Sequence, residues 1–143
     1  QLLYSQKNGE FERARAMVRA EARKNVDVLP KGAPALAELV LQQRQLEALV
    51  QDALDEFDQL DAARGSGVPM SFTIAMNTLK VAASRLVVEI VSGALVLCGM
   101  AGYAQGTPYS LGRQLRDAYS ATVMINNTRI LADNAHMLTI SKG

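Results

Sequence analysis

Few residues in this chain could carry out catalysis or bind a metal, and their spacing limits the chemistry. The chain has one histidine, His136, with Asp133 three residues earlier, and one cysteine, Cys98. Di-iron sites in helical bundles need a second Glu-x-x-His-type pair on another helix, and the sequence contains none. We therefore expect no metal site. A nucleophile pair of Cys98 with His136 is an alternative, but the apolar run around Cys98 favours a core position for this thiol.

Arg113, Arg116 and Asp117 form the densest polar group near an apolar loop. Arginines can bind an anionic ligand or a partner subunit through charge-assisted hydrogen bonds. Alternatively, Arg116 and Asp117 tie the loop to neighbouring helices, and the residues favour this structural role. The acidic cluster from Asp52 to Asp61 and the arginine-rich stretch from Glu10 to Lys24 are predicted to be solvated helix faces.

Composition predicts one globular domain. The chain has 143 residues, 49% of them hydrophobic, and a net charge of +1, so no global field attracts nucleic acid. A lone cysteine fits a reducing compartment, and we expect a cytoplasmic protein.

The uncharged run from Ile90 to Gly112 contains glycines and a proline, so no membrane helix is expected. No signal-peptide pattern is present, and Gln1 in place of Met suggests a fragment or a processed product.

The stretch from Met76 to Tyr103 is the most apolar part of the chain and predicts a central, buried helix that begins at Pro69 or Ser71. Apolar residues occupy every face of it, which is the pattern of a helix enclosed by others. Gly99 and Gly102 give backbone freedom where the helix should stop. A valine at Gly99 is expected to crowd this turn.

Two other long helices are expected to pack against the central one. The first runs from Pro34 to Arg64 and carries a heptad seam with spacings of three and four. The seam positions are Leu36, Leu39, Gln43, Leu46, Val50, Ala53, Phe57 and Leu60. The last helix starts near Ser110 and has a weak point at Asn126 and Asn127, whose amides compete for backbone hydrogen bonds.

The predicted fold is all-α: an antiparallel up-down helical bundle of three long helices plus a shorter N-terminal one. Residues 1–9 are expected to be a frayed lead-in to a helix over 10–24. Loops are expected at the Gly- and Pro-containing segments 25–34, 65–67 and 101–110. We divide the chain into an N-terminal lead-in and short helix, residues 1–33, and the bundle, residues 34–143.

The order of motifs around the central helix is specific enough to suggest a family. Lys80 is followed by the glycine turn VLCGMAGY, residues 96–103, then by Pro108, and then by Arg116-Asp117. This order resembles the C-terminal helical domain of the acyl-CoA dehydrogenase family, where the turn reads Q-I-x-G-G-x-G-[YF] and R-D begins the last long helix. The resemblance covers residues 34–138. Val96 replaces the family's Gln and Met100 replaces its second Gly.

The resemblance implies a flavoprotein that forms a homo-oligomer, a dimer or a tetramer, with this bundle as the subunit core. It also implies that the glycine turn approaches the adenine-diphosphate half of FAD in a neighbouring subunit, and that a threonine of the last helix contacts the flavin. The cofactor-binding residues implied in this way are Val96, Leu97, Cys98, Gly99, Met100 and Thr128.

The reaction implied is the α,β-dehydrogenation of an acyl thioester, carried on CoA or on a carrier protein. A carboxylate takes the α-proton while a hydride leaves the β-carbon for the flavin. Many family members place that Glu on the last helix, where this chain has Asn126 and Asn127. An amide cannot accept a proton near neutral pH, so the catalytic base is unknown. The alternative is a non-catalytic helical module for interaction or assembly.

Overall fold

The computed structural model describes residues 2–24, 30–62 and 67–141, and these residues form helices, turns and loops without a strand. Their six helices are, in order, α1 (Leu2–Ala22), α2 (Ala33–Ala62), α3 (Met70–Cys98), α4 (Met100–Tyr103), α5 (Gly112–Ile125) and α6 (Asn127–Ile140). The predicted all-α bundle is confirmed. The expected loops at 25–34 and 65–67 fall largely outside the described residues.

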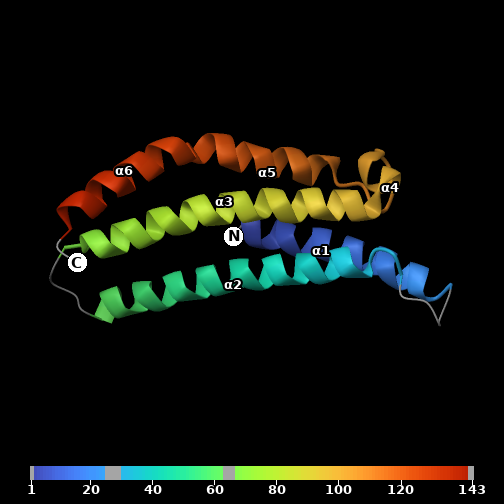
Figure 1. Ribbon diagram of the computed structural model, residues 1–143, viewed down its shortest axis with the longest axis horizontal. Coiled ribbons are helices and arrows are strands. Elements are labelled where there is room, and N and C mark those ends of the chain that lie inside the picture. The colour runs from blue at the N-terminus through green and yellow to red at the C-terminus, as the bar shows by residue number, and fades with distance from the viewer. Residues whose placement is uncertain (1, 25–29, 63–66, 142–143) are drawn as a thin grey trace.

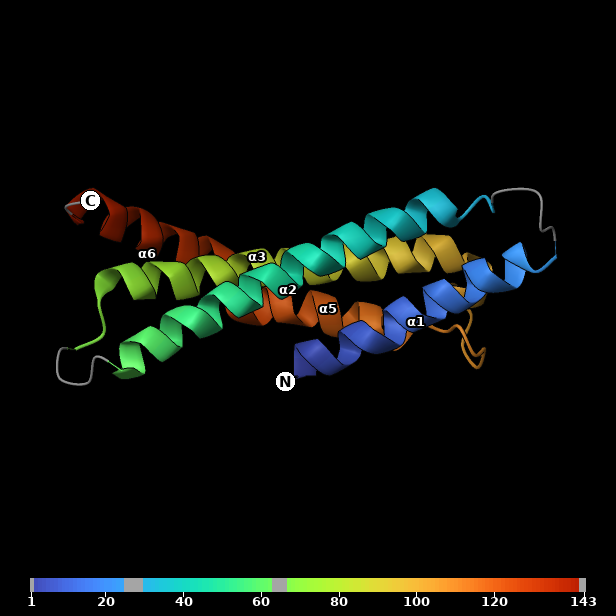
Figure 2. The ribbon, with the colours of Figure 1, turned by 90° about the horizontal axis from the view of Figure 1, so that it is seen from below.

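Helix α3 is the centre of the bundle. It lies between α2 on one side and α5 and α6 on the other, and α5 and α6 together run back along its length (Figure 1). Helix α1 also contacts α3 and α2, but it accompanies only the half of the bundle nearest α4 (Figure 2). One end of the bundle is therefore built from more helices than the other.

The core follows one stripe of α3, with contributions from α1, α2 and α5. The buried residues of α3 recur mostly every three or four positions and are Val81, Ser84, Val87, Ile90, Val91, Ala94 and Cys98. Ala14 of α1, Leu39 and Leu46 of α2, and Ala118 of α5 complete the same cluster. The expectation that α3 is enclosed on every face is wrong: Lys80, Arg85 and Glu89 are exposed along the helix, and Val96 is 81% exposed near its end.

The heptad seam of α2 is confirmed over its first half. Leu39 and Leu46 are buried, and Leu36 and Val50 pack against the same core. Gly93 allows α2 and α3 to come close, because a Cβ there would lie 2.9 Å from Cδ2 of Leu39. Further along the seam, Phe57 is 57% exposed, in the half of the bundle that α1 does not reach.

Two helix boundaries differ from the sequence-based expectation. The N-terminal helix begins at Leu2 rather than Glu10, so the expected frayed lead-in is helical. Once a helix is nucleated, each further residue adds one hydrogen bond at little cost. Met100–Tyr103 forms a separate short helix, α4. The sequence had predicted a loop from Ala101 onward. The division at residue 33 stays a prediction.

The predicted weak point of the last helix is confirmed. Asn126 adopts the left-handed conformation, with φ 50° and ψ 65°, and separates α5 from α6. Asparagine tolerates this conformation better than most residues. Its side-chain oxygen also accepts a hydrogen bond from the backbone N–H of Arg129, which caps the start of α6.

Candidate functional site

The glycine turn between α3 and α4 ends the central helix sharply. The N–H of Gly99 donates to the carbonyls of Leu95 (2.9 Å) and Val96 (3.3 Å). Gly99 has φ 58° and ψ −141°, a backbone conformation that residues with a Cβ rarely adopt. A Cβ at Gly99 would meet no atom within 4 Å. The expectation that a valine would crowd the turn is therefore wrong. A valine at Gly99 would have space, but it would have to adopt an unfavourable backbone conformation.

The turn separates the predicted cofactor-binding residues into two groups. Val96 is 81% exposed and Met100 is 78% exposed, and both flank the open surface beside Gly99. Cys98 is buried, and Leu97 packs against the core. The side chains of Val96 and Met100 can therefore contact a ligand outside the bundle, whereas those of Leu97 and Cys98 pack in its interior.

The loop after α4 folds back on the turn and fixes the start of α5. The backbone N–H of Leu111 donates to the carbonyl of Gly102 at 2.8 Å, and the Leu111 side chain is fully buried. Thr107 donates through its hydroxyl to the carbonyl of Ala101. Arg13 of α1 donates to the carbonyl of Ser110 at 3.3 Å, a contact that the sequence did not predict.

A cleft of about 670 Å³ opens where the turn, the loop and the first turns of α5 meet. Its lining residues are Leu95, Tyr103, Ala104, Gln105, Ser110, Gly112, Arg113, Leu115 and Arg116. Arg113 forms a loose surface pair with Asp117, at 3.8 Å, and its side chain is 85% exposed. The predicted role of Arg116 and Asp117, as ties between the loop and the neighbouring helices, stays a prediction.

The second predicted region lies at the break between α5 and α6, away from the glycine turn (Figure 1). Asn126 and Thr128 are exposed. Asn127 instead faces α3, where its amide nitrogen donates to the hydroxyl of Ser84 at 2.9 Å. The four residues at the break, 125–128, include no carboxylate, so this segment supplies no group that could take a proton from a substrate carbon.

A row of buried polar contacts joins α6 to α3, and sequence reasoning missed it. Asn134 is buried; it accepts a hydrogen bond from Asn77 at 3.0 Å and donates to the Ile74 carbonyl at 3.3 Å. Ser84, also fully buried, pairs with Asn127. The available signal was Asn77 and Ser84, two polar residues seven positions apart on one face of a mostly apolar helix. Such contacts fix the register of two helices.

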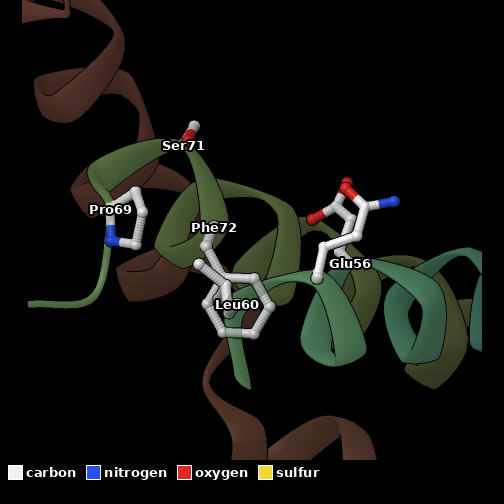
Figure 3. A pocket seen from close by; sticks show the side chains of 6 residues that line it. Glu56, Leu60, Pro69, Ser71 and Phe72 are labelled. Atoms are coloured by element: carbon white, nitrogen blue, oxygen red, sulfur yellow. The ribbon is translucent and has the colours of Figure 1, made fainter. Parts of the chain in front are cut away.

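Shallow hollows also follow the groove between α2 and α3. Figure 3 shows the one near the far end of the groove, where Leu60 and Phe72 lie together and Glu56 stands to one side, with Pro69 and Ser71 above. A second hollow shares Glu56 and adds Asp52. Asp52, Asp55 and Asp58 are exposed, as expected of a solvated face.

The remaining reactive side chains do not form a catalytic group in the described part of the chain. Burial raises the pKa of the Cys98 thiol, an effect that the guanidinium of Arg13 partly offsets. His136 is exposed on α6, while Cys98 is buried at the other end of α3. Within the described residues, no group of three or more His, Cys, Asp and Glu side chains could hold a metal ion.

By length and composition alone, α3 could cross a membrane, with a mean hydropathy of 1.9 over its most apolar window. It is the one described helix of which this is true. In this fold it is the core helix of the bundle, and core helices of soluble proteins satisfy the same criteria. The expected absence of a membrane helix stays a prediction.

The fold and the site together define a class: a helical bundle in which a central apolar helix ends at a glycine turn, and a kinked helix pair returns along it. The model of the acyl-CoA dehydrogenase C-terminal domain family matches residues 7–132. The chain therefore belongs to this family. Searches of curated proteins and of solved structures gave no match.

Proposed function

We propose that this chain is the helical domain of a flavin-dependent enzyme that oxidises an acyl thioester between its α- and β-carbons. The observation that carries the proposal is the family match over residues 7–132. We propose that the acyl group is carried on CoA, for which the family is named, or on a carrier protein. The domain contributes part of the pocket and the core of the oligomer.

The glycine turn offers a surface that suits part of a dinucleotide. Val96 and Met100 present exposed apolar side chains, and Gly99 is exposed, with open space where a Cβ would lie. A flat ring can approach such a backbone closely. Leu97 and Cys98 can contribute only backbone atoms there, because their side chains pack inward. Bound FAD supplies the acceptor for the hydride that leaves the β-carbon.

The proton acceptor of the proposed reaction lies outside the break between α5 and α6. Asn126 caps α6 and Asn127 is hydrogen-bonded to Ser84, so both amides have structural roles. We propose that a carboxylate from elsewhere in the enzyme takes the α-proton. The bundle then positions the acyl chain and excludes water.

Exposed apolar residues support assembly into a homo-oligomer. Near the turn these are Val96, Met100 and Tyr103, and on the outer face of α5 they are Tyr119, Val123 and Met124. Tyr119 and Val123 are four residues apart on α5 and so share one face of that helix. Exposed apolar side chains that gather on one face usually mark a protein interface. We propose a dimer or a tetramer in which these surfaces are covered.

The test is a visible absorbance spectrum of the native protein that carries this chain, recorded after incubation with FAD and removal of free cofactor. We expect bound flavin, which acyl thioesters bleach when an electron acceptor is absent. Light scattering on the same sample should give the mass of a dimer or tetramer. A colourless protein that oxidises no acyl thioester contradicts the proposed function.

A second candidate is a helical interaction module without catalytic activity. The observation that favours it is the break itself, where residues 125–128 lack a carboxylate. In that case the oligomer forms without flavin, and the same experiment separates the two functions. Assembly that requires FAD contradicts the interaction module.

A further inference from the structure

Three hollows lie in a row between α2 and α3. They measure about 570, 200 and 330 Å³, and neighbouring hollows share lining residues, first Leu49 and Asp52 and then Glu56. On α2 their lining runs from Gln45 to Leu60, which corresponds to roughly 22 Å at about 1.5 Å per residue. The hollows therefore form one groove, long enough for a helix of about four turns.

The floor of this groove is apolar. Leu60 and Phe72 lie together at one end of it (Figure 3). Leu49 and Leu79 continue the floor along its middle, together with Ala53 and Met76. Leu49, Leu60, Phe72 and Leu79 are only half-buried, so part of each side chain still faces water. A third apolar surface laid in the groove would withdraw these side chains from water, which is favourable.

The rim that α2 contributes to the groove is acidic. Asp52 and Glu56 line it four residues apart, so they are neighbours on one face of the helix. Between Arg44 and Arg64 the chain has six acidic residues and no basic one, and residues 65–79 carry no charged side chain. A negative potential therefore follows the groove along this part of α2.

These features select among the possible ligands. Carboxylates on the rim repel the phosphate groups of nucleic acids and of anionic lipids. Within the described residues, no group of three or more His, Cys, Asp and Glu side chains could hold a metal ion. A two-fold contact pairs identical surfaces, so a second copy seated on this face would place Asp52 and Glu56 against like charges. The surface matches a partner that combines an apolar face with cations beside it.

We propose that the groove binds a basic amphipathic helix of another protein, with apolar side chains against Leu49, Leu79 and Phe72 and with lysines or arginines beside Asp52 and Glu56. An amphipathic helix in an apolar groove is a recurrent mode of protein recognition. Cations four residues apart on that helix match the four-residue spacing of the two carboxylates. The inference goes beyond the proposed function and does not depend on it.

The test is fluorescence anisotropy of a labelled helical peptide, titrated with the 143-residue chain. The peptide has about 16 residues, the length of the groove, with leucines along one face, lysines at four-residue spacing beside them, and alanines elsewhere. We expect saturable binding that weakens as the salt concentration rises. A peptide of the same composition in scrambled order, which lacks an apolar face, should bind at least about tenfold more weakly.

Two double variants separate the rim from charge in general. Asp52→Asn/Glu56→Gln should bind the peptide at least about fivefold more weakly, the loss expected for two ion pairs that are partly withdrawn from water. The matched control is Asp55→Asn/Asp58→Asn, which removes the same charge from exposed positions of α2 that do not line the hollows. We expect this control to bind nearly as the unmodified chain does.

The fold of each variant is checked by circular dichroism melting. Asp52 is exposed and Glu56 half-buried, so the substitutions should leave the bundle intact. If the double variant is unstable, the single exposed change Asp52→Asn decides the question.

Three results of the titrations would overturn the proposal: no saturable binding, equal affinity for the scrambled peptide, or equal weakening in the two double variants. Equal weakening would show a general attraction between opposite charges rather than recognition by a groove. Light scattering on the same samples addresses the remaining occupant. A change of oligomeric mass in Asp52→Asn/Glu56→Gln, but not in its control, would assign the groove to a second copy and also overturn the proposal.

Discussion

Individual glycines in this bundle have different physical roles. Gly93 provides space, because a Cβ there would meet Leu39 of α2 at 2.9 Å, and Gly102 does the same beside Cys98 at 2.8 Å. Gly99 provides a conformation, since its φ of 58° and ψ of −141° suit a residue without a Cβ while the space around it is open. The end of α3 therefore depends on one backbone geometry.

Replacing Gly99 by Val should lower the free energy of unfolding by about 1–3 kcal/mol, the cost of a strained backbone conformation. Urea denaturation measures this. The control is Gly112→Ala, where φ is not left-handed and a Cβ would also meet nothing within 4 Å. We expect Gly112→Ala to be neutral or slightly stabilising. Equal effects of the two substitutions would show that conformation is not the cause.

At the scale of elements, how deeply α2 is buried against α3 depends on whether a third helix, α1, lies beside them. Residues of the same seam have different surroundings: Leu39 is 2% exposed and Phe57 is 57% exposed. Helix α1 accompanies only the half of the bundle nearest α4 (Figure 2). A heptad seam predicts which face of a helix packs, but the depth of burial depends on the neighbours present at each level.

These two seam positions should therefore respond differently to truncation. Leu39→Ala should lower the free energy of unfolding by about 2–5 kcal/mol, because it leaves a cavity in the core. Phe57→Ala should cost no more than about 1 kcal/mol, since less than half of its side chain is withdrawn from water. Urea denaturation of both variants decides; a larger loss for Phe57 would contradict the packing of α2 described above.

At the scale of the whole molecule, α1 completes the core around Cys98. Ala14 of α1 is fully buried in the same cluster as Cys98, and Arg13 links α1 to the loop before α5. Burial raises the pKa of the Cys98 thiol above its ordinary value of 9.0, although Arg13 acts in the opposite direction. The folded chain thus holds this proton more tightly than the unfolded chain does.

Stability should accordingly fall at alkaline pH. Well below pH 9.0 the thiol is protonated in both the folded and the unfolded chain, and burial of the neutral thiol contributes fully to stability. As pH rises from there through the folded pKa, the unfolded chain loses the proton first, which favours unfolding by at most about 1.4 kcal/mol per pH unit. Urea denaturation between pH 7 and 10 measures the slope. Cys98→Ala should show a smaller decline over the same range, and an equal decline would contradict this account.

The sequence alone determined the helical class, the central helix, its end in the region of Gly99 and Gly102, and the weak point at Asn126 and Asn127, because apolar periodicity and the local preferences of Gly and Asn act over a few residues. The order of Lys80, the glycine turn and Arg116-Asp117 also suggested the family that the match over residues 7–132 shows. Helix propagation over residues 2–9 was missed, since helix formers next to a nucleated helix give only a weak local signal.

Only the tertiary structure decided which side chains are exposed and which meet a neighbouring helix. It turned Cys98 and Leu97 inward and left Val96 and Met100 exposed, paired Asn127 with Ser84, and brought the loop and α5 together into the arginine-lined cleft. The physical reason is that these contacts join residues far apart in the chain. Their geometry depends on how whole helices pack, and no local sequence preference specifies it.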